Sequence, residues 1–261
     1  MTTVDFITEL FVRVDDAMPN QQKHSQARLF PSETATLGLL FALKGVGNRA
    51  FYRWAERDLK PLFPHLPERT RLFRLLAAHK DWTDCFLAQP TLLGVADSFG
   101  IELLHPWRLG RSGKQIGKKG HSNHRWIVGG KLGFVLNRFG QVCAWDSTTA
   151  NTHDSVFQPL IQKFDGQMLV LADIHFHKKD SDPPNLKVCR RGVWNDRMLI
   201  ETVLSMLAGV CHFKHIGHRV WRYFEMRLAF MMAVFNICVG WDGLQADENG
   251  FVPLSLAQFS L

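Results

Sequence analysis

The sequence predicts an α/β fold in which a small all-helical domain precedes a mixed sheet with flanking helices. Three observations support this prediction: helical periodicity up to about residue 90, short strand-like apolar runs after it, and helical periodicity again in the last third. The chain has 261 residues, of which 46% are hydrophobic, enough for a sizeable packed core. A disordered or fibrous protein is therefore excluded.

The first 90 residues carry apolar side chains at helical spacing. Phe6, Leu10 and Val14 mark the first helix. Ser32 is a candidate N-cap ahead of the apolar run at 37–43, although Ala35 stands where a capping box would have Glu or Gln. We expect residues 1–90 to form an all-helical domain.

Short apolar runs of strand type begin at residue 91. The expected elements are strands at 92–96, 126–136, 142–145 and 168–172, with a helix at 155–164. A meander of three strands, then a helix, then a buried strand, is the order of a ribonuclease-H-like core. We therefore predict a ribonuclease-H-like mixed sheet with flanking helices.

The last third of the chain returns to helical periodicity after one more short strand. We expect a strand at 186–190 and helices at 195–213 and 220–241. The ribonuclease-H-like domain then covers residues 91–241, and residues 242–261 form a C-terminal tail.

The cysteine pattern and the length of the apolar runs indicate in which cellular compartment the protein is expected. The five cysteines form no Cys-x-x-Cys pair, so neither a disulfide framework nor a zinc ribbon is indicated. Asp5 and Glu9 interrupt any secretory signal. The longest apolar run, 228–241, contains Asn236 and is shorter than the roughly 20 residues that a membrane span needs. We expect a cytoplasmic, nucleoid-associated protein without a membrane partner.

Positive charge is concentrated between Glu102 and Asp146. The chain has a formal net charge of +7, and this interval contains no acidic residue. Its basic residues are Arg108, Arg111, Lys114, Lys118, Lys119, Arg125, Lys131 and Arg138. Glycines interrupt the segment, which is typical of a loop that follows a polyanion backbone rather than of a packed element. A solvated loop without a partner is the alternative, and charge alone does not decide between them.

Three carboxylates stand where metal-dependent phosphoryl chemistry would need them. Asp97 and Asp173 each follow an apolar strand, so we expect both at one end of the sheet. Glu201 lies four residues after Arg197, on the same face of one helix. Carboxylate oxygens suit Mg²⁺, and two such ions can stabilise the attacking and leaving oxygens of phosphodiester cleavage. Each acid alone is more commonly a surface residue, but their joint placement favours a metal site.

Three motifs together resemble the insertion-sequence transposases of the Asp-Asp-Glu class. They are V-A-D-S at Asp97, T-T-A-N-T-H-D at residues 148–154 and W-x-x-R-x-x-x-E ending at Glu201. The group most similar to this chain is the nine-eighty-two family of the IS-four-like assembly. The helical segment L-F-P-S-E-T-A-T-L-G-L-L-F-A-L-K-G is also similar to that family, so the resemblance runs from about Phe30 to Trp241.

The resemblance implies a fold, a reaction and its partners. It implies a DNA-binding helical domain and a catalytic triad of Asp97, Asp173 and Glu201 that binds Mg²⁺, for which Mn²⁺ can substitute. The implied partner is double-stranded DNA, namely the terminal inverted repeats and the target DNA. A homodimer is compatible with binding to these DNAs. Trp194 and Arg197 would contact DNA beside the cleaved phosphate, together with the basic segment.

The chain also departs from the family pattern. Trp194 and Ala208 replace the tyrosine and lysine of the signature helix. After Asp173 the chain has Ile174 and His175 where a glycine and a tyrosine are usual, and the stretch up to Glu201 is short. These departures support an alternative, a catalytically degenerate DNA-binding remnant. A metal-dependent nuclease without a joining step is a third hypothesis.

Histidines offer a competing interpretation. His212, His215 and His218 are spaced by three, and His175 and His177 follow the second aspartate, so a zinc or iron site is conceivable. Gly217 argues against a continuous helix there, and structural or phosphate-facing histidines are favoured. The remaining polar candidates are His153, Asp146 and Asp154. Asp154 is expected to cap the helix that follows it. No nucleophile elbow indicates serine chemistry.

Overall fold

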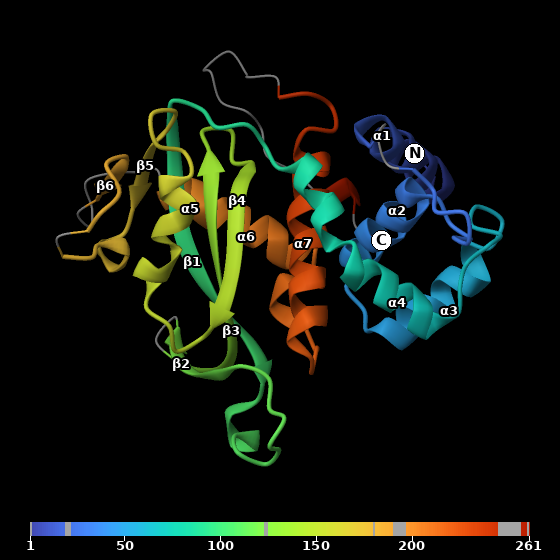
Figure 1. The fold of residues 1–261 in the computed structure, drawn as a ribbon, viewed down its shortest axis with the longest axis horizontal. Helices are drawn as coiled ribbons and strands as arrows, with labels where there is room; N and C mark the ends of the chain where they lie inside the picture. Colours follow the sequence, from blue (N-terminus) through green and yellow to red (C-terminus); the bar gives the residue numbers. More distant parts are fainter. Residues whose placement is uncertain are drawn as a thin grey trace.

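The protein has a mixed α/β architecture in which helices at the N-terminus precede a curled sheet with flanking helices (Figure 1). The computed structural model describes residues 2–18, 22–122, 125–179, 181–189, 197–244, 257–259 and 261. The predicted α/β class is confirmed. Within the described part of the chain, no helix has the length and apolar character needed to cross a membrane.

The N-terminal region is helical, as its periodicity predicts. Its elements are α1 (Thr3–Ala17), α2 (Pro31–Lys44), α3 (Asn48–Asp58), α4 (Arg69–Ala78) and the 3₁₀ segment η1 (Lys80–Phe86). α1 begins with a capping box in which Thr2 and Asp5 each accept a backbone N–H from the other. Its apolar stripe, which includes Phe6, Leu10 and Val14, is buried.

The expected N-cap at Ser32 is wrong by two residues. α2 begins at Pro31, and Phe30 occupies the N-cap position. The Glu33 carboxylate accepts the Phe30 N–H at 2.6 Å, while proline at the first helical position has no N–H to leave unpaired. Ser32 is therefore buried inside the first turn. The helix ends at Gly45, whose φ of 64° suits a glycine.

The described residues form one sheet of six strands. These are β1 (Leu93–Leu104), β2 (Lys118–Ser122), β3 (Arg125–Asn137), β4 (Val142–Thr149), β5 (Leu169–Ala172) and β6 (Leu186–Val188). The order is β2-β3-β1-β5-β6, and β4 also pairs with β3. β1, β3 and β4 form the expected antiparallel meander, whereas β5 pairs in parallel with β1 and with β6.

β1 and β2 differ most from the sequence-based expectation, while β4 extends beyond the expected 142–145 to Thr149 and β6 ends at Val188. β1 does not end before Asp97 but continues to Leu104, because it stays paired with β3 and buries Ile101. Asp97 therefore lies inside a strand. Residues 118–122, expected as part of a loop, form β2 along the first half of β3.

The other helices are shorter than the periodicity suggests. They are η2 (Pro106–Arg108), η3 (Asp154–Phe157), α5 (Gln158–Gln162), η4 (Ile174–Phe176), α6 (Arg197–Gly209), η5 (Phe213–His215), α7 (Trp221–Val239) and η6 (Ala257–Phe259). The helix expected at 155–164 is divided into η3 and α5. The helix expected at 195–213 is described only from Arg197 and ends at Gly209.

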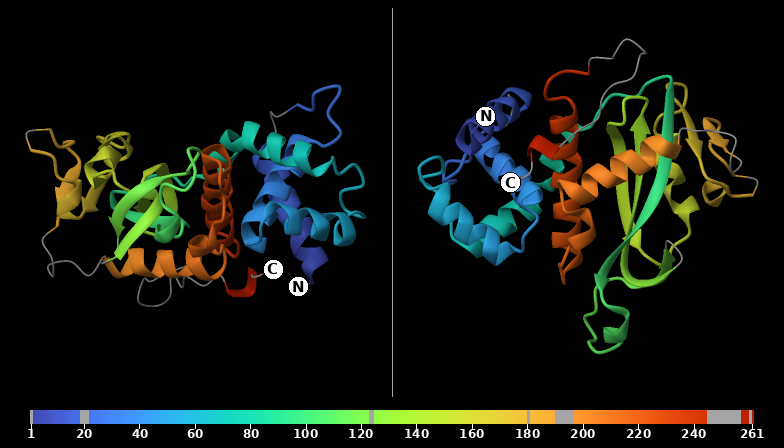
Figure 2. Two further views of the ribbon diagram at one scale, coloured as in Figure 1. Left: turned by 90° about the horizontal axis from the view of Figure 1, so that it is seen from below. Right: turned by 180° about the vertical axis from the view of Figure 1, so that it is seen from behind.

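The two faces of the sheet bury different partners. α5 lies on one face, and α6 crosses the other (Figures 1 and 2). Val95, Leu132 and Phe134 belong to the large core that includes α6, α7 and the N-terminal helices, whereas Ala96 and Val135 belong to the small core under α5. Alternate residues of one strand thus face different helices, as the period of a strand requires.

Candidate active site and nucleic-acid interface

The parallel pairing of β1 with β5 brings two of the predicted catalytic acids to neighbouring strands. Ala96 pairs with Ala172, and Asp97 and Asp173 are the residues that directly follow this pair. Both side chains are half-buried. Asp173 Oδ1 accepts the His175 N–H at 3.1 Å, and Asp97 Oδ1 accepts the Ser98 N–H at 2.7 Å. We expected both acids where their strands end, at one end of the sheet; Asp173 does follow the end of β5, but Asp97 lies inside β1, which continues to Leu104.

Asp97 lies on the face of the sheet that α6 covers. Val95 belongs to the core beneath α6, and side chains alternate along a strand, so Asp97 shares the face of Val95. α6 packs against β1 and carries the third predicted acid, Glu201, which is exposed beside the buried Ile200. Among the described residues, no three His, Cys, Asp or Glu side chains form a group that could hold a metal ion. Asp97 thus lies in β1 and Asp173 directly after the neighbouring β5, and the described residues do not include Glu201 in a metal-binding group with them.

The aspartate pair suits a hard divalent cation. Mg²⁺ is commonly held by one or two carboxylates, with water and substrate phosphates as its other ligands. Asp97 and Asp173 supply such a pair of oxygen donors on adjacent strands. Soft transition metals would instead favour thiolate or imidazole ligands. Two carboxylates are thus the donor type that suits Mg²⁺ or Mn²⁺ rather than a soft transition metal.

A partly buried network links the T-T-A-N-T-H-D motif to Ser98 of β1, the residue after Asp97. Asp154 Oδ1 accepts a hydrogen bond from Ser98 Oγ at 2.8 Å and from Lys131 Nζ at 2.6 Å. Lys131 also donates to the Thr152 carbonyl at 2.7 Å. The expected N-cap role of Asp154 is wrong, because His153 occupies the N-cap of η3 and leaves Asp154 free to pair with the lysine. This network could not be predicted from the sequence, because nothing local signals a pairing across the sheet.

Exposed histidines flank the second aspartate. His175 lies two residues after Asp173, in η4, and its ring contacts that of His153 with 6.1 Å between centroids. Both histidines are exposed, and η4 packs against η3. His177 instead pairs with Asp182 at 2.5 Å.

The three histidines after α6 do not share a helix. α6 ends at Gly209, and His212 has a φ of 52° at the N-cap of η5. His218 follows η5 and is buried. In the described residues the three histidines therefore do not lie on one helical face. A zinc or iron site built on their spacing of three would need that arrangement.

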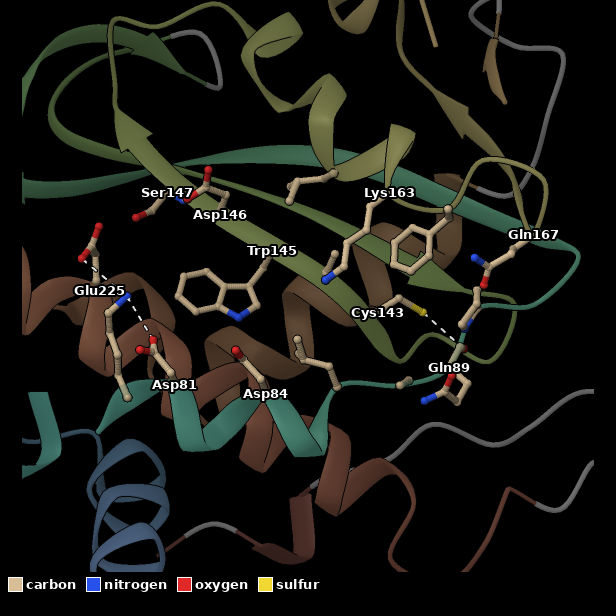
Figure 3. A pocket seen from close by; sticks show the side chains of 17 residues that line it. Asp81, Asp84, Gln89, Cys143, Trp145, Asp146, Ser147, Lys163, Gln167 and Glu225 are labelled. Atoms are coloured by element: carbon tan, nitrogen blue, oxygen red, sulfur yellow. Dashed lines mark hydrogen bonds and ion pairs between the residues drawn. The ribbon is translucent and has the colours of Figure 1, made fainter. Parts of the chain in front are cut away.

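A groove of about 540 Å³ lies elsewhere, at the β4 side of the sheet (Figure 3). In Figure 3, Trp145 of β4 lies between Lys163, which follows α5, and Asp84 of η1. Asp146 and Ser147 also line the groove. Burial, and then the nearby Asp81, raises the pKa of the Asp84 carboxyl. The groove includes Asp146 but neither Asp97 nor Asp173, so it is separate from the aspartate pair.

The predicted DNA-binding residues lie mostly on one projection of the sheet. We call residues 105–122 the basic arm; it leaves the end of β1, projects beyond the sheet and returns as β2 (Figure 1). Its exposed cationic side chains are Arg108, Arg111, Lys114, Lys118 and Lys119. Arg125, on the adjacent start of β3, is exposed and lies 3.5 Å from Glu102. Trp194 is outside the described residues, and so is the side chain of Arg197, which begins α6.

The basic arm is not a simple loop, because two of its glycines occupy backbone positions that suit glycine. Gly117 has a φ of 73°, and a Cβ on Gly120 would come within 1.9 Å of the Ala150 carbonyl oxygen. Glycine at these positions therefore permits a turn and a close approach of the backbone. Lys131 pairs with Asp154, and its side chain is only 12% exposed, so it does not add to the phosphate-facing surface.

Comparison with protein-family models, with curated proteins and with solved structures found no match. Two features of the chain bear on its function. One is the aspartate pair on β1 and β5, and the other is the basic arm. The motif resemblance implies metal binding for the aspartate pair and DNA binding for the arm.

Neutralising Lys114, Lys118 and Lys119 together should flatten the salt dependence of DNA binding. Each phosphate neutralised contributes roughly −0.9 to the slope of log affinity against log salt, so we expect the slope to fall by about two to three units. DNA binding measured by fluorescence anisotropy over a salt series tests this. Replacing Lys60, Lys163 and Lys187, which lie outside the arm, provides a matched control. An unchanged slope in the arm variant would identify the arm as a solvated surface.

Proposed function

We propose that this chain is a DNA transposase of the Asp-Asp-Glu class. It would cleave DNA at the terminal inverted repeats of an insertion sequence and join the ends to target DNA. The observation that carries this proposal is the parallel pairing of Ala96 with Ala172, which sets Asp97 and Asp173 on adjacent strands. Two acids so placed suit a divalent cation at a phosphodiester.

The order of elements supports a ribonuclease-H-like sheet for this function. β1, β3 and β4 are consecutive antiparallel partners apart from the short β2, and α5 then leads to β5, which returns beside β1 in parallel. α6 lies on the face opposite α5 (Figure 2). This matches the order of strands and helix on which the fold expectation rests.

Each group has a distinct role in the proposed reaction. Asp97 and Asp173 would hold Mg²⁺ or Mn²⁺, which stabilises the charge on the attacking and leaving oxygens. Glu201 is the third ligand that the motif resemblance implies, and its exposed position on α6 leaves it accessible to DNA. The basic arm would bind the phosphate backbone and orient the duplex, and a homodimer would present one active site to each end.

A degenerate, DNA-binding remnant is the second candidate. The described residues contain no group of three potential ligands that could hold a metal ion. Ala208 lies seven residues after Glu201, about two helical turns along the same face of α6, where the family pattern has a lysine. A lysine there would add a positive charge facing the same DNA, which alanine cannot supply.

The deciding experiment follows three products on one substrate. The full-length protein is incubated with Mg²⁺ and DNA that carries the element's own ends, with supercoiled plasmid as target and EDTA as the control. The proposal expects metal-dependent cleavage at the ends and joined products. Cleavage without joining would favour a nuclease, and binding without cleavage would favour the remnant.

The same assay tests the consequence of Ala208. We expect weak strand transfer by the natural protein and a gain in Ala208→Lys, because the added charge faces the DNA beside Glu201. The exposed Ser205→Lys places a lysine on α6 four residues after Glu201 and serves as a positional control. Strong transfer by the natural protein, with no gain in Ala208→Lys, would contradict the degeneration hypothesis.

A further inference from the structure

Two tryptophans on and beside the basic arm are exposed to solvent. The side chain of Trp107 in η2 is 81% exposed, and that of Trp126 at the start of β3 is 58% exposed. Large aromatic side chains usually contribute to a core or to an interface. We propose that Trp107 and Trp126 stack on unpaired bases, so that the arm binds a junction between duplex and single-stranded DNA. This inference rests on the proposed DNA-processing function and adds the form of DNA that the arm prefers.

Trp126 is held by its cross-strand neighbours. Its β2 partner is His121, whose ring centroid lies 5.4 Å away, and Lys119 Nζ lies 4.8 Å from the centroid of the indole. The ring is thus positioned before any ligand arrives, which lowers the entropy lost on binding. A cation beside an exposed aromatic ring matches a nucleotide, in which a phosphate lies next to a base.

Trp107 lies in a short, capped turn on the same projection. The His105 side chain accepts the Trp107 N–H at 3.4 Å, and η2 packs against β3. Within the described part of the chain, no aromatic ring contacts the Trp107 indole. The neighbouring Arg108 is exposed and can reach a backbone phosphate. Trp107 therefore combines an open aromatic surface with an adjacent positive charge.

Unpaired DNA fits these features better than a continuous duplex does. Inside a duplex the faces of each base are covered by the neighbouring pairs, so an indole stacks far more readily on an unpaired base that has left the stack. The arm is continuous with β1, which also carries Asp97, so DNA held on the arm would lead along the sheet toward the aspartate pair. An anionic membrane also attracts tryptophan and basic residues, but usually through an amphipathic helix, whereas this arm is built of turns and β2.

Equilibrium binding to two related DNAs tests the inference. Fluorescence anisotropy is measured in EDTA, so cleavage plays no part, with a blunt duplex and with the same duplex carrying a single-stranded 3′ extension. We expect Trp107→Ala to weaken binding to the extended DNA by roughly 5- to 150-fold and to change blunt-duplex binding little. Trp126→Ala should act in the same direction. Trp107→Phe should restore most of the affinity, and Leu109→Ala, an exposed apolar neighbour on the arm, should have little effect.

The salt dependence separates stacking from charge. Trp107→Ala should leave the salt slope unchanged, since no phosphate contact is removed. Equal affinity of the natural protein for both DNAs, equal loss on both DNAs in Trp107→Ala, or binding to anionic phospholipid vesicles that depends on Trp107 would overturn the inference. The transposase proposal would survive these results if metal-dependent cleavage persists, so the two failures are distinguishable.

Discussion

Asp97→Asn is expected to reduce Mg²⁺-dependent DNA cleavage by about 10³-fold or more while leaving DNA affinity nearly unchanged. Asparagine keeps the shape of the side chain and can still accept the Ser98 N–H, but it lacks the negative charge that would hold a divalent cation. Loss of metal stabilisation of the reacting oxygens costs several kcal/mol of transition-state energy, about three orders of magnitude in rate. Single-turnover nicking and anisotropy measured on the same preparation test both parts.

Asp165→Asn is the matched control for this charge removal. Asp165 is exposed in the turn before β5, where its carboxylate accepts the Gly166 N–H at 3.0 Å. We expect this variant to cleave as the natural protein does. Asp173→Asn and Glu201→Gln should resemble Asp97→Asn if all three acids serve one site. Full cleavage by Asp97→Asn would contradict the assignment of the aspartate pair.

Lowering the pH from 7 to 4.5 should reduce the free energy of unfolding by about 2 kcal/mol through His218 alone. Burial, and then the nearby positive charge of Arg227, lowers the pKa of His218 from 6.5 to about 4. Below pH 6.5 the unfolded chain binds a proton that the folded protein excludes, so stability falls as the pH falls toward 4. Burial also leaves His218 Nε2 without a hydrogen-bond partner among the described residues.

Urea unfolding of the natural protein and of His218→Gln at the two pH values measures this contribution. Glutamine does not titrate, so the variant should lose less stability between pH 7 and 4.5, whatever its stability at pH 7. His65→Gln is the control, since His65 is exposed in both states. The same pH-dependent loss in the natural protein and in His218→Gln would show that other groups cause it.

The local sequence pattern predicted the elements that bury apolar side chains in a regular way. The α1 stripe at Phe6, Leu10 and Val14 packs one face on a core, and β3 is apolar because it is buried on both faces of the sheet. Element ends were predicted less well. The N-cap of α2 depends on Pro31 and Glu33 together, and the end of β1 depends on its pairing with β3. A pairing partner distant in the sequence leaves no local signal.

The candidate site, too, was predictable from the sequence only in part. The sequence by itself determined that Asp97 and Asp173 accompany two apolar strands, that the region between Glu102 and Asp146 is basic, and that a helix carries Glu201. Only the tertiary structure decided that β1 and β5 are parallel neighbours and that Asp154 pairs with Lys131. It also decided which tryptophans are exposed. Strand neighbours and solvent exposure depend on how distant segments pack, and side-chain type and local spacing do not specify that packing.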